Sequence, residues 1–273
     1  MKDLLTSTQV AELLGVGASS VKRWADSGRL PCVRTPGGHR RFLRDEVERA
    51  LAPSLRGAIP LRAVEDQATR WYDLLAAGTG PFELRMALAS DFERQGAWWR
   101  VAEGIAMALT EVGERWRRGV LTITEEHTAS ESLSRAVARA AEAQIVPENA
   151  PVCLLMTPPG EDHTLGLGLA ELIARAQGWE TRWVGSGAPL DEIEAVMDRG
   201  EVQMVTVAAL AHLSEPSVLE DVSRRLVAAS ERNGVAVVLA GSAEWPDPPF
   251  ASRVRRARNF EQFADALRGA KAA

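Results

Sequence analysis

One stretch constrains the fold more than any other, because it joins a buried strand to an amphipathic helix through a tight loop. The apolar run Val152–Met156 leads into the loop 157–166, and residues 167–173 then follow a helical apolar period. Open α/β sheets bind their ligands at the carboxyl ends of strands. The stretch therefore predicts an α/β sheet with a site at its edge.

The loop carries His163 directly after two carboxylates, Glu161 and Asp162. A carboxylate that accepts a hydrogen bond from one ring nitrogen fixes the tautomer and leaves the other nitrogen for a metal. A solvated loop histidine is the alternative when the loop is considered alone. Cys32 and Cys153 are the only cysteines, too few and too distant for a disulfide framework or a thiolate cluster.

Charge is distributed unevenly along the chain. Residues 1–56 contain ten Lys or Arg and six Asp or Glu, a net charge of +4, so the formal net charge of −5 leaves −9 on the remainder. A basic segment joined to an acidic body favours a head that binds a polyanion. No apolar run approaches a membrane span and no signal sequence starts the chain, so we expect a cytoplasmic protein.

The pattern of residues 1–56 is typical of a winged helix-turn-helix domain. Thr6 and Gln9 have the spacing of a capping box, and a second short helix, 18–27, follows a glycine-containing turn. On this second helix, Val21 and Trp24 are expected to face the core. Strands at 30–34 and 40–42 predict the wing, and residues 44–51 a closing helix.

Positively charged and polar side chains of the second helix and the wing are the candidates for DNA contacts. In such heads the second helix enters the major groove while wing arginines neutralise phosphates. A basic solvated face is the alternative. The candidates are Ser19, Ser20, Lys22, Arg23, Arg34, His39, Arg40 and Arg41.

Two further domains are expected after the linker 52–60. Residues 61–147 predict four helices, and helices of this length suggest an antiparallel bundle. Residues 151–273 alternate strands (181–184, 202–209, 235–239) with helices (190–199, 216–230, 259–269), which predicts a doubly wound, Rossmann-like parallel sheet. The fold class is therefore multidomain α and α/β.

Two strings carry resemblances to known families. Residues 10–16, 21–24 and 34–42 look like the winged-helix heads of the mercury-resistance-regulator and excisionase superfamily, which bind DNA. The bundle has Trp116, nine residues and then Glu126-His127, and the α/β domain opens with Glu161-x-His163-x-x-Gly166. With the winged helix, this order resembles the cobalamin-binding, light-responsive repressors of carotenoid genes over nearly the whole chain.

The resemblance implies a role for each matching residue. His163 would replace the cofactor's benzimidazole as lower axial cobalt ligand, with Glu161 orienting it, and Trp116, Glu126 and His127 would enclose the adenosyl group of adenosylcobalamin. Gly166, His212 and Gly241 are the remaining cofactor-binding candidates. The resemblance further implies a homo-oligomer, a dimer or tetramer, that binds double-stranded operator DNA. Light would dissociate this oligomer.

Three departures separate the chain from that family. Arg117 stands where the photoreceptors have a histidine that binds cobalt after photolysis, and a guanidinium offers no lone pair. Residues 208–213 lack the family's serine, and its Gly-Gly is Ala240-Gly241. These changes fit either a looser cobalamin site or another tetrapyrrole, a bilin such as biliverdin.

The sequence thus predicts a DNA-binding regulator, a repressor, controlled by a tetrapyrrole. A ligand-free oligomerising scaffold is a further alternative. An enzyme such as a corrinoid methyltransferase or a mutase fragment is disfavoured, because the chain has no substrate-binding barrel and its N-terminus is a DNA-binding head.

Overall fold

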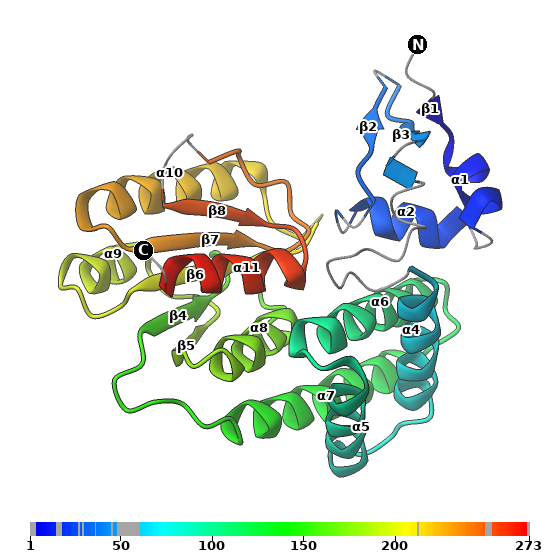
Figure 1. The fold of residues 1–273 in the computed structure, drawn as a ribbon, viewed down its shortest axis with the longest axis horizontal. Helices are drawn as coiled ribbons and strands as arrows, with labels where there is room; N and C mark the ends of the chain where they lie inside the picture. The colour runs from blue at the N-terminus through cyan, green and yellow to red at the C-terminus, as the bar shows by residue number, and fades with distance from the viewer. Residues whose placement is uncertain are drawn as a thin grey trace. The chain divides into compact units, whose positions relative to one another are not determined.

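The computed structural model describes residues 4–14, 18–26, 28, 30–35, 37–44, 46–47, 61–211, 213–248 and 253–271, without the side chains of 12–14, 20 and 61–63 (Figure 1). The chain divides into two compact units, each made of two segments. One unit is Met1–Ala77 with Glu103–Thr122, and the other is Gly78–Ala102 with Ile123–Ala273. The predicted linker 52–60 and His212 lie outside the described residues.

The first unit begins with the predicted head. Its helices are α1 (Ser7–Leu14) and α2 (Ala18–Asp26), and its sheet has the order β1-β3-β2, with β1 at Leu4–Leu5, β2 at Val33–Arg34 and β3 at Arg40–Leu43. The Thr6 and Gln9 side chains each accept the other's backbone N–H, at 3.2 and 2.9 Å. The predicted capping box is confirmed. Most of the predicted closing helix 44–51 lies outside the described residues.

The core of the head continues into two helices of the same unit. Val21 and Trp24 are fully buried, as predicted, and they share a hydrophobic cluster with Val64 of α4 (Leu61–Ala76) and Met107 of α6 (Trp98–Arg117). Beside this cluster Gln67 of α4 packs so closely on Gly104 of α6 that a Cβ there would overlap its amide group. The head, α4 and most of α6 therefore form one packed body.

The second unit contains the remaining helices of the middle region, α5 (Pro81–Gln95) and α7 (Ile123–Glu142). Pro81 opens α5, a position whose N–H would have no partner within the helix, so its absence costs nothing. Gly96 ends α5 in the left-handed conformation at φ 71°. All four predicted helices are confirmed. Their assembly into one antiparallel bundle stays a prediction.

A five-stranded parallel sheet forms the rest of this unit, with the strand order β5-β4-β6-β7-β8. The strands are β4 (Val152–Met156), β5 (Glu180–Gly185), β6 (Met204–Ala208), β7 (Ala236–Ala240) and β8 (Val254–Ala257). The predicted doubly wound α/β domain is confirmed. Neither β8 nor β1 was predicted. In β8 two arginines, Arg255 and Arg256, stand between the buried ends of the strand and hide its apolar pattern.

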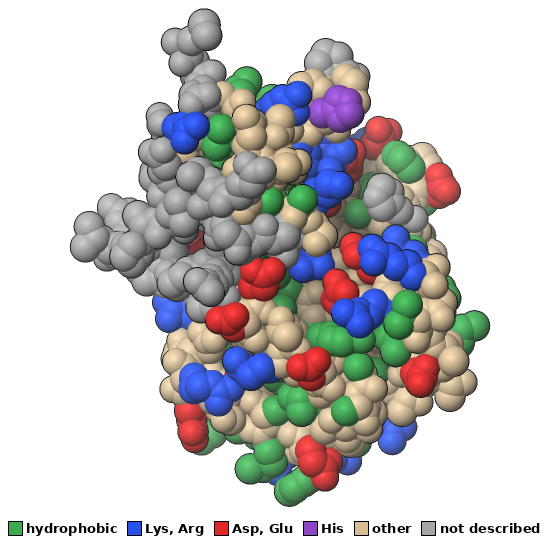
Figure 2. All heavy atoms as spheres, turned by 90° about the vertical axis from the view of Figure 1, so that its right-hand side faces the viewer, with side chains coloured by type: hydrophobic (Ala, Val, Ile, Leu, Met, Phe, Trp, Pro, Cys, Tyr) green, Lys and Arg blue, Asp and Glu red, His purple; other side chains and the backbone are tan. Residues whose placement is uncertain are grey.

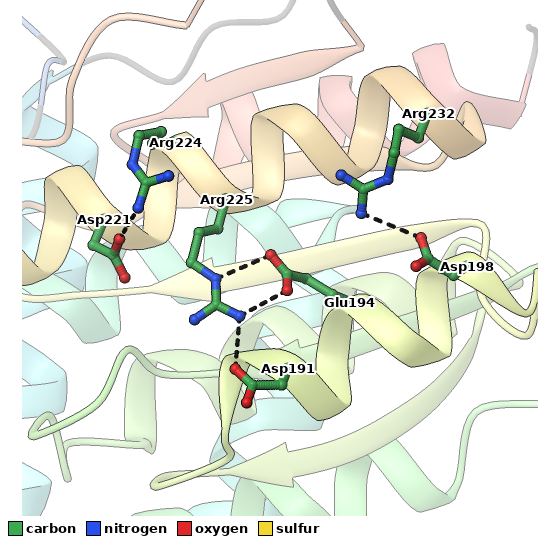
Figure 3. Close-up of polar contacts among 7 residues, drawn as sticks. All are labelled: Asp191, Glu194, Asp198, Asp221, Arg224, Arg225 and Arg232. Atoms are coloured by element: carbon green, nitrogen blue, oxygen red, sulfur yellow. Dashed lines mark hydrogen bonds and ion pairs between the residues drawn. The ribbon is translucent and has the colours of Figure 1, made fainter.

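Four helices pack in two pairs against this sheet. One pair is α8 (Leu165–Ala176) with α11 (Phe260–Lys271), and the other is α9 (Leu190–Asp198) with α10 (Pro216–Asn233). Figure 3 shows the guanidinium of Arg225 on α10 between two carboxylates of α9, donating to Glu194 at 3.0 and 2.7 Å and to Asp191 at 2.7 Å. Arg225 thus clamps the second pair together at the surface.

Candidate functional site

The loop after β4 is held by its own backbone and by β5. Thr157 donates from its N–H to the Gly185 carbonyl at 2.9 Å and from its hydroxyl to the Glu161 carbonyl at 2.5 Å. The N–H of Glu161 turns back to the Pro158 carbonyl at 3.1 Å, and Gly160 takes φ +84° in this turn. The loop therefore presents Glu161 and His163 from a fixed frame.

Glu161 lies against the imidazole of His163. One carboxylate oxygen lies 2.9 Å from the backbone nitrogen of His163 and 2.7 Å from its Nδ1, and it accepts a hydrogen bond from each. The Glu161 side chain is 1% exposed, whereas that of His163 is 63% exposed. Because the carboxylate accepts the proton on Nδ1, the lone pair of Nε2 faces outward, and no described residue bonds it. The imidazole is oriented to bind a ligand through Nε2.

The two glycines of the predicted site differ in what they require. A Cβ at Gly166, in the first turn of α8, would meet nothing within 4 Å. Gly241, after β7, has φ +92°, and a Cβ there would overlap the carbonyl oxygen of Ala209. Glycine is therefore required at 241 by the approach of two backbones.

The other cofactor candidates lie near helix ends. Trp116, in the last turn of α6, is 42% exposed. Glu126 accepts a hydrogen bond from Ser130 at 2.8 Å and lies 2.8 Å from Nδ1 of His127, whose side chain is 73% exposed. Trp116 belongs to one unit and Glu126-His127 to the other, so their joint enclosure of a ligand stays a prediction.

The DNA candidates occupy α2 and the wing. Ser19, Lys22, Arg34 and His39 are exposed, and Arg40 and Arg41 are half-buried; the side chain of Ser20 is not described. Arg40 and Arg34 both pair with Asp26 of α2, at 2.5 and 3.6 Å. These pairs hold wing arginines beside the second helix. Figure 2 shows Lys and Arg side chains in the upper part of that view and also lower down, interspersed with Asp and Glu.

Arg23 has a partner that the sequence did not predict. Its guanidinium lies 2.9 Å from Glu111 of α6, and the two side chains are only 17% and 26% exposed. Glu111 also accepts from Nε of Arg115 at 2.9 Å, and Arg115 lies 4.3 Å above the ring centre of Tyr72. A separation of 88 residues left no local signal for the pair of Arg23 and Glu111.

Two further properties hold for the described residues. No three His, Cys, Asp or Glu side chains there come together as a metal-binding group. None of the helices in the described part of the chain is long and apolar enough to cross a membrane.

Comparisons with known proteins match the N-terminal head and part of the helical middle region of the chain. A family model described as a helix-turn-helix domain matches residues 4–53, and one described as a B12 binding domain matches residues 100–140. The transcriptional repressor DcmR of Methylorubrum extorquens is 37% identical over 65 residues, which are 23% of this chain and 24% of DcmR. The HTH-type transcriptional repressor CarH of Myxococcus xanthus is 23% identical over 265 residues, covering 85% of this chain and 87% of CarH.

A solved structure has a similar fold over most of the chain. The monomethylamine corrinoid protein of Methanosarcina barkeri superposes with a TM-score of 0.53 at 15% identity, covering 76% of this chain and 99% of that one. At this identity the likeness concerns the fold alone. The two domain matches and the similarity to CarH over 85% of the chain lead to one conclusion. The chain is a helix-turn-helix DNA-binding regulator fused to a B12-binding domain.

Proposed function

We propose that this protein is a transcriptional repressor whose DNA binding is controlled by cobalamin held through His163. The observation that carries the proposal is the pair formed by the buried Glu161 carboxylate and His163, which leaves Nε2 directed outward. A buried carboxylate on the remote nitrogen orients a metal-binding histidine and raises its basicity.

The donor set at the site fits a corrinoid. His163 offers one neutral nitrogen, and no further His, Cys, Asp or Glu among the described residues joins it as a third ligand. A bare transition metal needs several protein ligands, whereas bound cobalamin supplies cobalt already held in the corrin ring and open to an axial nitrogen. His163 would provide that nitrogen.

The finer assignments are proposals by the same reasoning. Trp116, Glu126 and His127 would cover the opposite face of the ligand, and a bound adenosyl group would lie against them. Gly166 leaves room beside the first turn of α8, because a Cβ there would touch nothing within 4 Å. Gly241 follows β7 at the same edge of the sheet. His212 is a further candidate by its place in the sequence.

On the DNA side, Lys22 and the wing residues Arg34, His39, Arg40 and Arg41 would contact operator DNA, together with Ser19, Ser20 and Arg23. Exposed Lys and Arg bind phosphates with a strong dependence on salt. A homo-oligomer would place several heads on one operator.

Absorption spectroscopy of the protein with added adenosylcobalamin tests the ligand. We expect a spectral change as His163 displaces the benzimidazole, and we expect His163→Ala to abolish it. His39→Ala, a histidine of the head, is the matched control and should keep the change. Equal affinity and equal spectra for wild type and His163→Ala would refute cobalt ligation.

Arg117 favours a second candidate ligand. Its Nε donates to the Gly113 carbonyl at 3.3 Å, and a guanidinium offers no lone pair to a metal. The upper ligand that the resembling photoreceptors use after photolysis is therefore absent, which supports either a light-independent cobalamin response or a bilin such as biliverdin. A copurifying pigment that absorbs in the far red would support the bilin.

A further inference from the structure

The loops after β6 and β7 are joined by three hydrogen bonds at the carboxyl edge of the sheet. The N–H of Ala209 donates to the Ala240 carbonyl and that of Ala243 to the Ala209 carbonyl, both at 3.1 Å. The N–H of Ala211 donates to the hydroxyl of Ser242 at 2.9 Å. Only this third bond uses a side chain, so Ser242 is the residue whose identity sets the position of Ala211.

Arg256 of β8 also holds the end of β7 and the loop after it. Its two terminal nitrogens donate to the carbonyls of Leu239 at 2.7 Å, Gly241 at 2.9 Å and Ala243 at 2.5 Å. Burial lowers the pKa of Arg256 to about 10, so the guanidinium keeps its charge at neutral pH. One planar cation thus satisfies three carbonyls around Ser242 from two nitrogens held in one plane, a geometry that the single ammonium nitrogen of a lysine does not reproduce.

Leu210 lies between the two anchored residues Ala209 and Ala211. Its backbone N–H donates at 3.3 Å to the second carboxylate oxygen of Glu161, the oxygen that does not contact His163. Within the described residues this is the one hydrogen bond to the Glu161 carboxylate from outside the loop 157–166. The position of the β6 loop therefore fixes the rotation of the carboxylate that orients His163.

We propose that Ser242 and Arg256 are positioning residues for His163, acting through the loop after β6 and the buried carboxylate of Glu161. The path runs from Arg256 to the β7 loop, from the Ser242 hydroxyl to Ala211, and from the Leu210 N–H to Glu161. The role of His163 as a ligand rests on the proposed function, whereas the orientation of its ring does not.

The first test uses the protein without any ligand. Nitrogen-15 NMR of the histidine rings reports which ring nitrogen carries the proton, and we expect wild type to hold His163 protonated at Nδ1. Ser242→Ala should shift this resonance toward a mixture of tautomers, and Ser242→Thr, which keeps the hydroxyl, should restore it. Ser217→Ala, an exposed serine of α10, is the matched control.

The second test measures cobalamin binding by titration with adenosylcobalamin. Loss of the hydrogen bond between a metal-binding histidine and its carboxylate costs about tenfold or more in affinity. Ser242 acts on that bond only through Ala211, Leu210 and Glu161, so we expect a rise in Kd of up to about tenfold for Ser242→Ala and recovery in Ser242→Thr. Arg256→Lys should act in the same direction. Circular dichroism establishes that each variant is folded.

The outcomes separate the two proposals. A tautomer shift in Ser242→Ala supports the positioning role even if adenosylcobalamin binds no variant, in which case only the proposed ligand fails. An unchanged His163 resonance in folded Ser242→Ala overturns the positioning role, whatever the cobalamin affinity of wild type.

Discussion

Replacing Glu111 should strengthen DNA binding by the protein without ligand. Arg23, a candidate for DNA contact on α2, is held 2.9 Å from the Glu111 carboxylate, and both side chains are mostly buried. Arg23 can reach DNA only after this pair separates. Glu111→Gln keeps the size of the side chain and removes its charge, so it lowers the free energy needed to release Arg23.

The size of the effect follows from the geometry. A charged hydrogen bond contributes about 1.5–3 kcal/mol to stability, whereas exposed ion pairs contribute about 0.2–1 kcal/mol. This pair is partly buried, and the amide oxygen introduced by Glu111→Gln would still accept a hydrogen bond. We therefore expect Glu111→Gln to lower the free energy of releasing Arg23 by about 1 kcal/mol. That free energy corresponds to about a fivefold gain in affinity.

The pH of the assay matters. The hydrogen bond from Arg115, together with the attraction of Arg23, lowers the pKa of Glu111 from 4.5. Its pairing therefore stabilises the protein fully above pH 4.5 and weakens only as pH falls through the lowered pKa, so it is intact at pH 7.

Fluorescence anisotropy with labelled operator DNA at low salt measures the change. Glu114→Gln is the control, because Glu114 lies on the same helix and pairs with the exposed Arg118 at 3.5 Å. Affinity for Glu111→Gln that equals the control, or falls below it, would refute the masking of Arg23.

Three further predictions concern the body. Gly241→Ala should destabilise the protein by about 3 kcal/mol or more in urea unfolding, because its Cβ overlaps the Ala209 carbonyl and φ is +92°; an unchanged midpoint would contradict this contact. Cys153, whose pKa burial raises to about 12, should react with a thiol reagent at about pH 8 only after unfolding, as mass spectrometry of the labelled peptide would reveal. Arg225→Met should lower the melting temperature at pH 7. Because the Arg225 hydrogen bond lowers the pKa of Asp191 from 3.8, the difference in melting temperature between variant and wild type should narrow in acid. A difference that does not depend on pH would exclude the ion pair as its cause.

Local patterns were sufficient for most of the fold. The strand, loop and helix around residues 152–173 were readable because burial on both faces gives a continuous apolar run and the helix repeats every three or four residues. Strand β8 was not predicted because its sequence does not alternate apolar and polar residues. Its Arg256 is a charged residue that donates hydrogen bonds to backbone carbonyls at the edge of the sheet.

The candidate site was only partly predictable, for a related reason. The contact between Glu161 and His163 spans two residues, so their spacing already suggested it. Ser242 accepts a hydrogen bond from a backbone N–H 31 residues away, and Arg256 donates to backbone carbonyls 13 to 17 residues away. Glu111 pairs with Arg23, 88 residues away on another helix. A single sequence carries no record of such pairs.

Helix α6 has a consequence for the cooperativity of unfolding. Its residues up to Ala102 belong to one unit and those from Glu103 to the other, so the boundary between the units falls within continuous helical hydrogen bonding. Neither unit can be released by cutting the chain at a single peptide bond, because each unit is built from two separate segments. Melting of one unit would fray the helix that the other needs, and we expect the two to lose structure as one calorimetric transition.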